Sequence, residues 1–405
     1  MDTDLSLLGQ QVPDISETDF ERAFGEPIST TLDIDQWRSG EDLAGVTGRL
    51  EREIEDARLA ETDVRRTIRK EIFPRIKTWE NAPKGKDLAG VWVAKPEEVD
   101  SALRGYLFAG NVEAADGTSK LIDTLPVTIA QVGVCTTTYR GDQGEWGHRM
   151  YRRDFRGKSG DDIADMIALL EARRNRTGFE KSSRRDGFSD LLRRAFMTWA
   201  ERAVLTRKCH AEWRMGHGNP LAYELLTGSG LAALIAPSIA LLSELVLHHK
   251  KFVFVPSSMS DRLIATIASA LKPLEYAIVS DSRAYLNRVL DGGFRGTTSG
   301  YEQAKNVLTA FIASVQEEVV VGAYRVSNIG PAHIFYAHRE FAHQAAIIAM
   351  ADGALLEHRG FPMLIDLADA LCRAMFHGET LAAATNLAFI DAGATLDFAT
   401  ERMTR

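Results

Sequence analysis

The sequence has little cysteine, with three residues of this type in a chain of 405. Cys135, Cys209 and Cys372 lie far apart and match no zinc-ligand or disulfide spacing. This pattern excludes a disulfide-rich secreted scaffold and favours reduced thiols in a cytoplasmic protein.

Long hydrophobic segments are also scarce. The first ten residues, MDTDLSLLGQ, contain no basic region and no apolar core, so we expect no signal peptide. The most apolar run, residues 231–247, is short and contains Pro237 and Glu244. It predicts a buried helix or helix pair rather than a membrane span.

A nucleotide-hydrolysis motor is not predicted either, because the segment GSGLAALIAP lacks the lysine of a P-loop and does not have its second glycine at the P-loop spacing. No repeat of fixed period is visible. The content of 45% apolar and 26% charged residues is that of an ordinary globular protein, with one large or two ordinary domains.

Negative charge is concentrated at the start of the chain. Residues 1–42 contain eleven acidic residues against Arg22 and Arg38, a net charge of −9, so the remaining chain carries +1 of the total of −8. We expect an acidic leader, extended or partly ordered, before a balanced body with basic stretches that can bind a polyanion.

The rest of the chain predicts a mixed α/β fold with an antiparallel portion. Charges of alternating sign and an apolar stripe predict an amphipathic helix from about Gly45 to Trp79. The stripe consists of Leu50, Ile54, Leu59, Val64, Ile68 and Ile72. A β-rich region is expected over 105–139 and a helical region over 160–208. Further strands are expected at 219–231, 250–261, 276–286, 317–327 and 333–341, followed by helices to the end.

Asp116 is the first candidate site residue. It lies in the segment ADGTS, where we expect a tight turn at a strand end, and such a carboxylate can bind a divalent cation. Gly117 would let the backbone approach a ligand, and Thr118 and Ser119 could orient a phosphate. The competing interpretation is an ordinary turn, since Asp-Gly is a common turn dipeptide.

Glu201 is the second candidate. It lies near the apolar face of the helix predicted in SDLLRRAFMTWAERAVL, residues 189–205, where a charge is costly unless paired or bound to a metal. The alternative is a surface ion pair with Arg194 or Arg202.

Two basic stretches interleaved with aromatic residues, 139–158 and 171–194, are suited to phosphate contact and base stacking. The alternative is a solvated charged helix face. The candidate DNA-binding residues are Arg149, Arg152, Arg153, Arg156, Arg184 and Arg185. His338, one of three histidines at five-residue spacing, is a secondary candidate for proton transfer; a metal cluster is not expected there.

These motifs together resemble the NurA family of DNA-end-processing nucleases. AADGTS is followed by β-rich sequence and then by a helix with a Met and a Glu, and AYELLTGSGL resembles the family's lvliDGpL strand. KFVFVPSSMSDRL and GFPMLIDLADAL resemble its middle strand and its closing gYPxxLxxAHxxA segment. The resemblance covers roughly residues 100–395 and predicts three regions: a leader at 1–42, a helical segment at 43–99 and a nuclease domain at 100–405.

The sequence departs from the family at several positions. Thr227 stands where the family has Asp, and Asp369 stands where it has His. Ser257 or Ser258 replaces a Lys. Asp369 could complete a set of three carboxylates with Asp116 and Glu201, and a shifted register would offer Glu224 instead of Thr227.

The resemblance implies a ribonuclease-H-like core, Mn²⁺ or Mg²⁺ at Asp116, Glu201 and Asp369, a homodimer, and a HerA-like hexameric ATPase as partner. It implies a DNA nuclease in repair or antiphage defence. The alternative is a catalytically degenerate subunit that serves as a DNA clamp or adaptor for the translocase.

Overall fold

The computed structural model describes residues 16–37, 47–124, 127–153, 161, 163–164, 166–167, 190–259, 261–293 and 299–394. The chain divides into two compact units, residues 1–74 and 75–405. The domain boundaries expected from the sequence stay a prediction.

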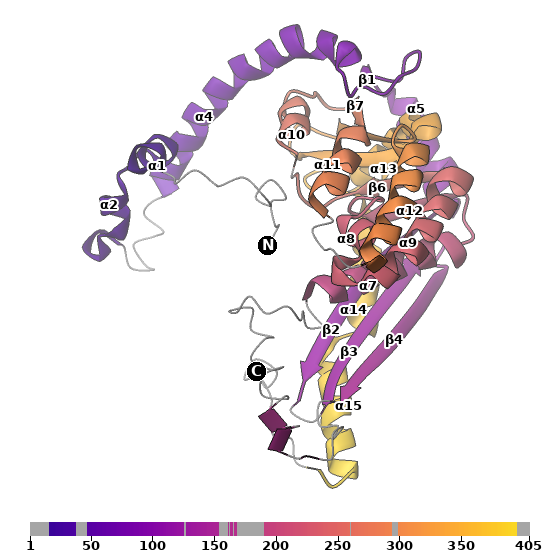
Figure 1. Cartoon of the computed structure of the whole chain (residues 1–405). Helices are drawn as coiled ribbons and strands as arrows, with labels where there is room; N and C mark the ends of the chain where they lie inside the picture. Colours follow the sequence, from indigo (N-terminus) through magenta and orange to yellow (C-terminus); the bar gives the residue numbers. More distant parts are fainter. Residues whose placement is uncertain are drawn as a thin grey trace. The chain divides into compact units, whose positions relative to one another are not determined.

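The first unit is helical where it is described (Figure 1). Its elements are α1 (Glu17–Phe24), α2 (Ile28–Leu32), the 3₁₀ turn η2 (Ile34–Gln36), α4 (Thr47–Thr67) and the π-helical turn η4 (Ile68–Ile72). Ser16 begins α1 as its N-cap, because its hydroxyl accepts a hydrogen bond from the Asp19 amide. The long helix predicted from about Gly45 onward is confirmed over Thr47–Thr67, where the chain forms α4. Of its apolar stripe, Ile68 is buried, whereas Leu50 and Val64 remain more than half exposed.

The second unit is built on one nine-stranded mixed sheet, which confirms the predicted α/β class. The strand order is β1-β7-β8-β9-β6-β5-β2-β3-β4 (Figure 1). The strands are β1 (Gly90–Val93), β2 (Val112–Asp123), β3 (Val127–Thr137), β4 (Gln143–Arg153), β5 (Trp213–His217), β6 (Phe252–Val255), β7 (Glu275–Asp281), β8 (Val319–Arg325) and β9 (Ala332–His338).

Five neighbouring strands, in the order β4-β3-β2-β5-β6, form one end of this sheet. β2, β3 and β4 are an antiparallel meander, whereas β5 and β6 run parallel to β2. Parallel strands require a crossover connection, and α7 supplies it between β4 and β5. The remaining pairs, from β6 to β1, are antiparallel, including the expected pair β8–β9.

Helices cover the sheet on both faces. The elements are η5 (Phe73–Thr78), α5 (Pro96–Ala102), η6 (Leu103–Leu107), α7 (Asp190–Arg207), α8 (Tyr223–Thr227), η8 (Gly228–Gly230), η9 (Ala232–Leu234), α9 (Ile235–Ser243), η10 (Glu244–His249), α10 (Arg262–Ser269), α11 (Arg283–Gly293), α12 (Ser299–Val315), η11 (Arg339–Phe341), α13 (Ala342–Gly353), η12 (Ala354–Leu356), α14 (Met363–Met375) and α15 (Gly378–Asp391). One core joins α13 and α14 to the sheet, and the other joins α7, α8, α9, α11 and α12 to it. The result is a three-layer arrangement with a core on each side of the sheet.

The stretch Ala232–His249 has the length and hydropathy of a membrane-crossing helix. Its residues Leu241, Leu242, Leu245 and Val246 are fully buried in the protein. It is a core element, formed by α9 and the π-helical turn η10.

The strand expected at 219–231 is wrong. Tyr223–Thr227 is the short helix α8, and Gly228, with φ of +66°, ends it. The strand of this region is β5, Trp213–His217, which ends just before the predicted range. A short apolar run such as LAYELL is compatible with either a buried helix or a strand, and periodicity does not separate the two.

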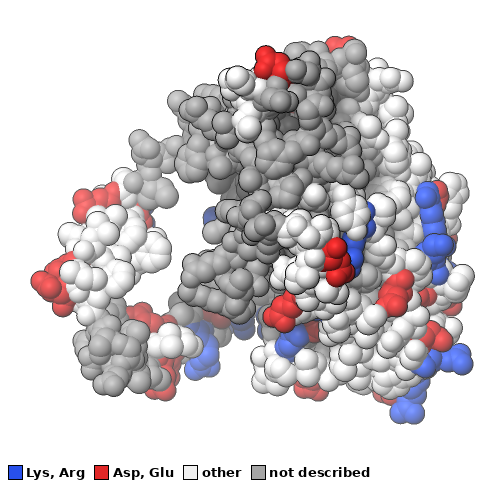
Figure 2. All heavy atoms as spheres, turned by 90° about the horizontal axis from the view of Figure 1, so that it is seen from below, with Lys and Arg blue, Asp and Glu red and all other residues white. Residues whose placement is uncertain are grey.

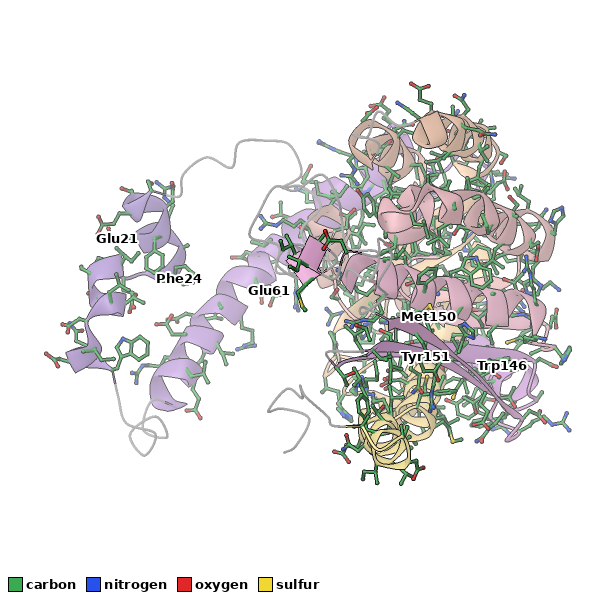
Figure 3. The ribbon with its side chains drawn as sticks, turned by 60° about the horizontal axis from the view of Figure 1, so that its bottom comes forward. Glu21, Phe24, Glu61, Trp146, Met150 and Tyr151 are labelled. Atoms are coloured by element: carbon green, nitrogen blue, oxygen red, sulfur yellow. The ribbon has the colours of Figure 1, made fainter. Side chains whose placement is uncertain are left out.

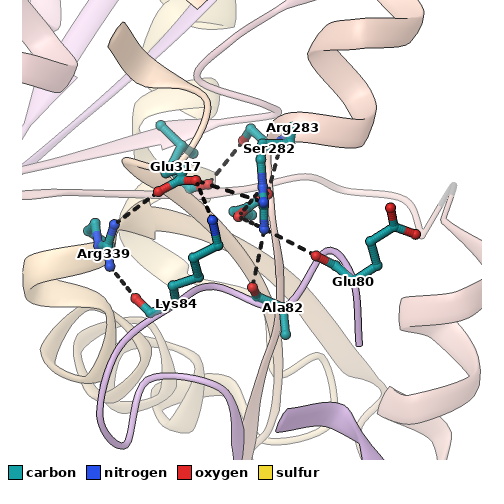
Figure 4. Close-up of polar contacts among 9 residues, drawn as sticks. Glu80, Ala82, Lys84, Ser282, Arg283, Glu317 and Arg339 are labelled. Atoms are coloured by element: carbon teal, nitrogen blue, oxygen red, sulfur yellow. Dashed lines mark hydrogen bonds and ion pairs between the residues drawn. The ribbon is translucent and has the colours of Figure 1, made fainter. Parts of the chain in front are cut away.

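Polar contacts attach the first loop of the second unit to the sheet (Figure 4). Arg283 donates to the carbonyls of Glu80 and Ala82 at 3.2 and 3.4 Å, while its guanidinium pairs with the buried Asp281 at 2.8 Å. Glu317 pairs with Lys84 at 3.3 Å. These bonds hold residues 80–84 against the ends of β7 and β8.

Candidate active site

Asp116 does not lie in a turn. The segment ADGTS is the middle of β2, where Asp116 pairs with Cys135 of β3 and only 9% of the aspartate is exposed. The twelve-residue strand continues through Gly117 because its partner β3, with eleven residues, pairs with it on both sides of this position. The prediction of a turn at ADGTS is therefore wrong, and Gly117 serves a packing role instead.

Gly117 makes room for Glu201. A Cβ atom at this position would lie 2.5 Å from Oε1 and 2.8 Å from Cγ of Glu201, which approaches from α7. Glu201 is 5% exposed. The two acidic candidates are separated by 85 positions in the sequence, and both thus lie at the same point of strand β2.

The alternation of β2 places the two carboxyls on different faces of the sheet. Gly117 and its partner Val134 face α7, whereas Asp116 and Cys135 face α14. The parallel pairing of β5 with β2 ends at Ala115 in the described chain. Among the described residues, no strand pairs with this side of β2 from Asp116 onward, so Glu201 and Asp116 both lie beside an open strand edge.

Burial raises the pKa of both carboxyls to about 7, and mutual repulsion adds to the shift of Asp116. Nearby Glu224 raises the pKa of Glu201 further, which places this secondary candidate within electrostatic reach of the pair. The Gly117 amide and Arg202 offset part of each shift. Two ionised carboxylates are therefore costly at this place, and a bound cation would offset their negative charge.

Arg202 is the buried counter-charge. Its guanidinium lies 3.3 Å from Glu201 and donates to the carbonyls of His217 and Asn219, both at 2.9 Å. It also lies over the Phe254 ring, 4.4 Å from the centroid. The alternative expected for Glu201 was a surface ion pair with Arg194 or Arg202. The pair with Arg202 is present, but it is buried. Arg202 holds the acidic pair against the end of β5.

A cavity of about 530 Å³ opens beside Asp116. It lies at the carboxyl ends of the parallel strands β5 and β6, where α/β sheets commonly bind ligands. Its lining residues come from β2, from the ends of β5 and β6, from the beginning of β9, and from the segment before and within α14: Asp116, His217, Ser257, Pro331, His333, His358, Arg359, Phe361, Ile365, Asp366, Asp369 and Arg373.

Asp369 lines this cavity from α14 and is held by Arg373, whose Nε donates to Oδ1 at 2.8 Å. Arg359 makes a similar pair with Asp366, with Nη2 3.2 Å from Oδ1. The structure brings Asp116 and Asp369 to one cavity and Glu201 to the edge beside it. Within the described ranges, no three His, Cys, Asp or Glu side chains converge as a ready-made cation site.

His217 is a site residue that the sequence analysis missed. It follows Gly216, which pairs with Ala115, so one position further along the two strands stand Asp116 and His217. Ser257 of the middle-strand motif donates its backbone N–H to His217 Nε2 at 3.2 Å. The signal was present in the sequence: HGNPL resembles the pattern DGpL at the end of a strand, with His217 in place of Asp and Asn219 as an additional residue.

The other candidates have different surroundings. Thr227 lies in α8, where its hydroxyl donates to the Tyr223 carbonyl at 2.9 Å, as a helical residue does. His338 is buried at the opposite end of β9, 3.1 Å from Glu318, and does not line the cavity.

Arg149 is the arginine candidate whose side chain is described. It lies on β4 and donates to Gln131 at 2.7 Å. The backbones of Arg152 and Arg153 belong to β4, but their side chains, like Arg156, Arg184 and Arg185, lie outside the described residues.

Arg149 shares its sheet face with Asp116. The register aligns Lys120, Gln131 and Arg149 across three strands, four residues beyond Asp116 on β2. Tyr151 follows on the same face of β4 and is 63% exposed (Figure 3). On the surface shown in Figure 2, the described basic side chains are otherwise interspersed with acidic ones.

No protein-family model and no curated protein matches this sequence. Solved structures of NurA do match. The NurA nuclease from Sulfolobus solfataricus is 9% identical, with 85% of this chain and 98% of that chain covered and a TM-score of 0.40. A second NurA structure is 10% identical, with 86% and 98% covered and a TM-score of 0.43. NurA with manganese is 10% identical, with 85% and 99% covered and a TM-score of 0.41. The chain thus resembles NurA nuclease structures over most of its length, as its motifs predict, and the likeness is one of fold.

Proposed function

We propose that the protein is a metal-dependent DNA nuclease that hydrolyses phosphodiester bonds at Asp116 and Glu201. The observation that carries the proposal is the buried pair of carboxyls, both with raised pKa, at an open strand edge beside a cavity. Two buried carboxylates destabilise the protein unless a positive charge, such as a bound cation, compensates them.

A divalent cation fits this donor set. Carboxylate oxygens are the ligands that Mg²⁺ and Mn²⁺ prefer, and a cation would cancel the repulsion that raises the pKa of Asp116. When bound, the cation would supply positive charge to the phosphate and acidify an attacking water. Asp369 is the proposed third ligand, which requires its carboxylate to leave Arg373.

The same sheet face offers a path for the DNA strand. Lys120 and Arg149 form a basic row beyond Asp116, and Tyr151 extends it with an exposed ring. Cations with an adjacent aromatic suit the backbone and bases of a single strand or frayed end. We propose that this row guides the strand toward Asp116.

The setting of the reaction follows the resemblance to NurA proteins. We propose a homodimer that acts with a HerA-like hexameric ATPase, in repair or antiphage defence, in the cytoplasm. The chain itself has no P-loop, so threading of DNA would have to come from a separate motor.

The test is cleavage of linear DNA by the full-length protein with Mn²⁺, with and without a purified HerA-like translocase. Asp116→Ala and Glu201→Ala are expected to lower the cleavage rate at least roughly 100-fold. Glu302→Ala, which removes an exposed acid of α12, is the matched control and should cleave normally. Equal activity of all four proteins would exclude Asp116 and Glu201 as catalytic residues.

A second function, a DNA clamp without catalysis, is favoured by the ion pair that holds Asp369 on Arg373 and by His217 at the end of β5. Both features leave fewer carboxylates for a cation. Intact DNA under every metal and partner condition, with DNA binding retained, would establish the clamp.

A further inference from the structure

The protonation of the His217 ring is fixed by its neighbour. The backbone N–H of Ser257 donates to Nε2 at 3.2 Å. A backbone amide can only donate, so Nε2 is the nitrogen without a proton, and the neutral ring carries its proton on Nδ1. Burial and, to a lesser extent, Arg202 lower the pKa of His217, and Asp366 offsets part of this shift.

Nδ1 is therefore a free donor. In the described part of the chain no acceptor is bonded to it, and the ring lines the cavity beside Asp116. The two arginines of the same cavity are different, because Arg359 and Arg373 are each paired with an aspartate. His217 thus offers the cavity a donor that, among the described residues, is hydrogen-bonded to no carboxylate.

This arrangement does not suit a cation ligand. A metal ion requires a nitrogen lone pair, but the lone pair of Nε2 accepts from Ser257 and Nδ1 carries a proton. An anionic oxygen is the natural partner for an N–H group at this place. His217 thus differs in kind from the aspartate that the DGpL pattern has at this position.

We propose that His217 donates a hydrogen bond from Nδ1 to a non-bridging phosphate oxygen of DNA bound in the cavity. It is a positioning residue for the substrate and not a ligand of the metal. The inference rests on the proposed function only in taking DNA as the occupant of the cavity.

Three variants at this position separate the possible roles. His217→Asn places an amide nitrogen near the position of Nδ1 and keeps the donor. His217→Gln extends its amide toward the position of Nε2 and loses the donor at Nδ1. His217→Ala removes both nitrogens.

The first measurement is binding of a fluorescent single-stranded oligonucleotide in EDTA, where neither metal nor cleavage contributes. Loss of one hydrogen bond to a charged phosphate predicts affinity about tenfold weaker for His217→Ala and His217→Gln. His217→Asn should stay within roughly twofold of the wild type, since its donor remains. The second measurement is Mn²⁺ binding, followed by the electron paramagnetic resonance signal of free Mn²⁺, and it should be unchanged in all three.

Each other outcome overturns the inference. Mn²⁺ affinity that falls in His217→Ala, with DNA affinity intact, would make His217 a metal ligand. Equal loss of DNA affinity in all three variants would make its role structural, and thermal melting identifies a variant that fails to fold. Wild-type affinity in His217→Ala would remove this inference alone, whereas a wild-type protein that binds no DNA would remove the proposed function as well.

Discussion

At the scale of single residues, the site depends on a glycine, Gly117, which has no side chain. Gly117 lets Glu201 approach the backbone of β2, and the sequence analysis assigned this glycine to a turn. Asp116 was a candidate as a carboxylate in a turn expected at a strand end, and Glu201 because a charge near the apolar face of a helix is costly. It missed His217, because its strand was placed about ten residues too late in the chain.

Gly117→Ala is expected to destabilise the fold by about 1–3 kcal/mol, because the new Cβ would overlap Glu201. Urea unfolding measures the effect. In a protein that already carries Glu201→Ala the same change should cost clearly less, since the overlap is gone. Gly292→Ala in α11, where a Cβ meets nothing within 4 Å, is the control and should be neutral or stabilising. Additive costs in the double variant would contradict the proposed clash.

The raised pKa of Asp116 and Glu201 predicts how stability depends on pH. The folded protein keeps these protons up to about pH 7, whereas the unfolded chain releases them near pH 4. The folded state therefore binds more protons between these values, and without metal its melting temperature should fall as pH rises through this window. A melting temperature in EDTA that climbs between pH 5 and 7 would contradict the assignment.

Mn²⁺ should reverse this trend, because it competes with protons for the same oxygens. We expect the melting temperature to rise more on addition of Mn²⁺ at pH 8 than at pH 6. The double variant Asp116→Asn, Glu201→Gln is the control and should lose most of the Mn²⁺ effect at both pH values.

At the scale of elements, α14 is the helix that the site depends on, because it carries Asp369 and Arg373. Phe376 at its end packs over Gly133 and Gly147, where a Cβ atom would approach the ring to 2.2 and 2.5 Å. The beginning of the helix is fixed by Asp352, whose Oδ2 accepts from the Leu364 amide at 2.9 Å.

Asp352 also accepts a hydrogen bond from the Tyr139 hydroxyl, and burial raises its pKa to about 7. Asp352→Ala leaves the buried Leu364 amide and the half-buried Tyr139 hydroxyl without this acceptor, which predicts a loss of roughly 2–4 kcal/mol. Tyr139→Phe removes one bond and should cost about 1 kcal/mol. Urea unfolding ranks the two variants, with Asp391→Ala at the exposed end of α15 as the neutral control. A smaller loss for Asp352→Ala than for Tyr139→Phe would contradict this account.

Elements with long, regular patterns were predictable, such as α4 and the pair β8–β9. The strand β4 was not, because its sequence QGEWGHRMYRR resembles a charged surface segment. Gly147 of this strand is selected by packing, because the absence of a side chain there admits the Phe376 ring from the end of α14. Such contacts join residues far apart in sequence, and local patterns do not encode them.

At the scale of the whole molecule, charge is divided along the chain. Residues 1–42 carry −9, and the described part of this leader forms capped and short helices rather than only extended chain. The body carries the candidate site. A segment of this charge repels DNA over a range set by the salt concentration.

Removal of residues 1–42 is expected to raise DNA affinity a few-fold at low salt and to leave it unchanged at high salt, because screening removes long-range repulsion. Fluorescence anisotropy with the full chain and the shortened chain measures both values. A gain above roughly tenfold that persists at high salt would indicate that the leader occupies the DNA site.

Side chains on the two sides of a β-sheet are normally insulated from each other by the strands and their substituents. At Gly117 this wall thins to bare backbone, and the carboxyls on its two sides influence each other's ionisation. The helices α7 and α14 never need to touch for this to happen. The pKa of Asp116 on one side of the sheet therefore responds to the charge of Glu201 on the other.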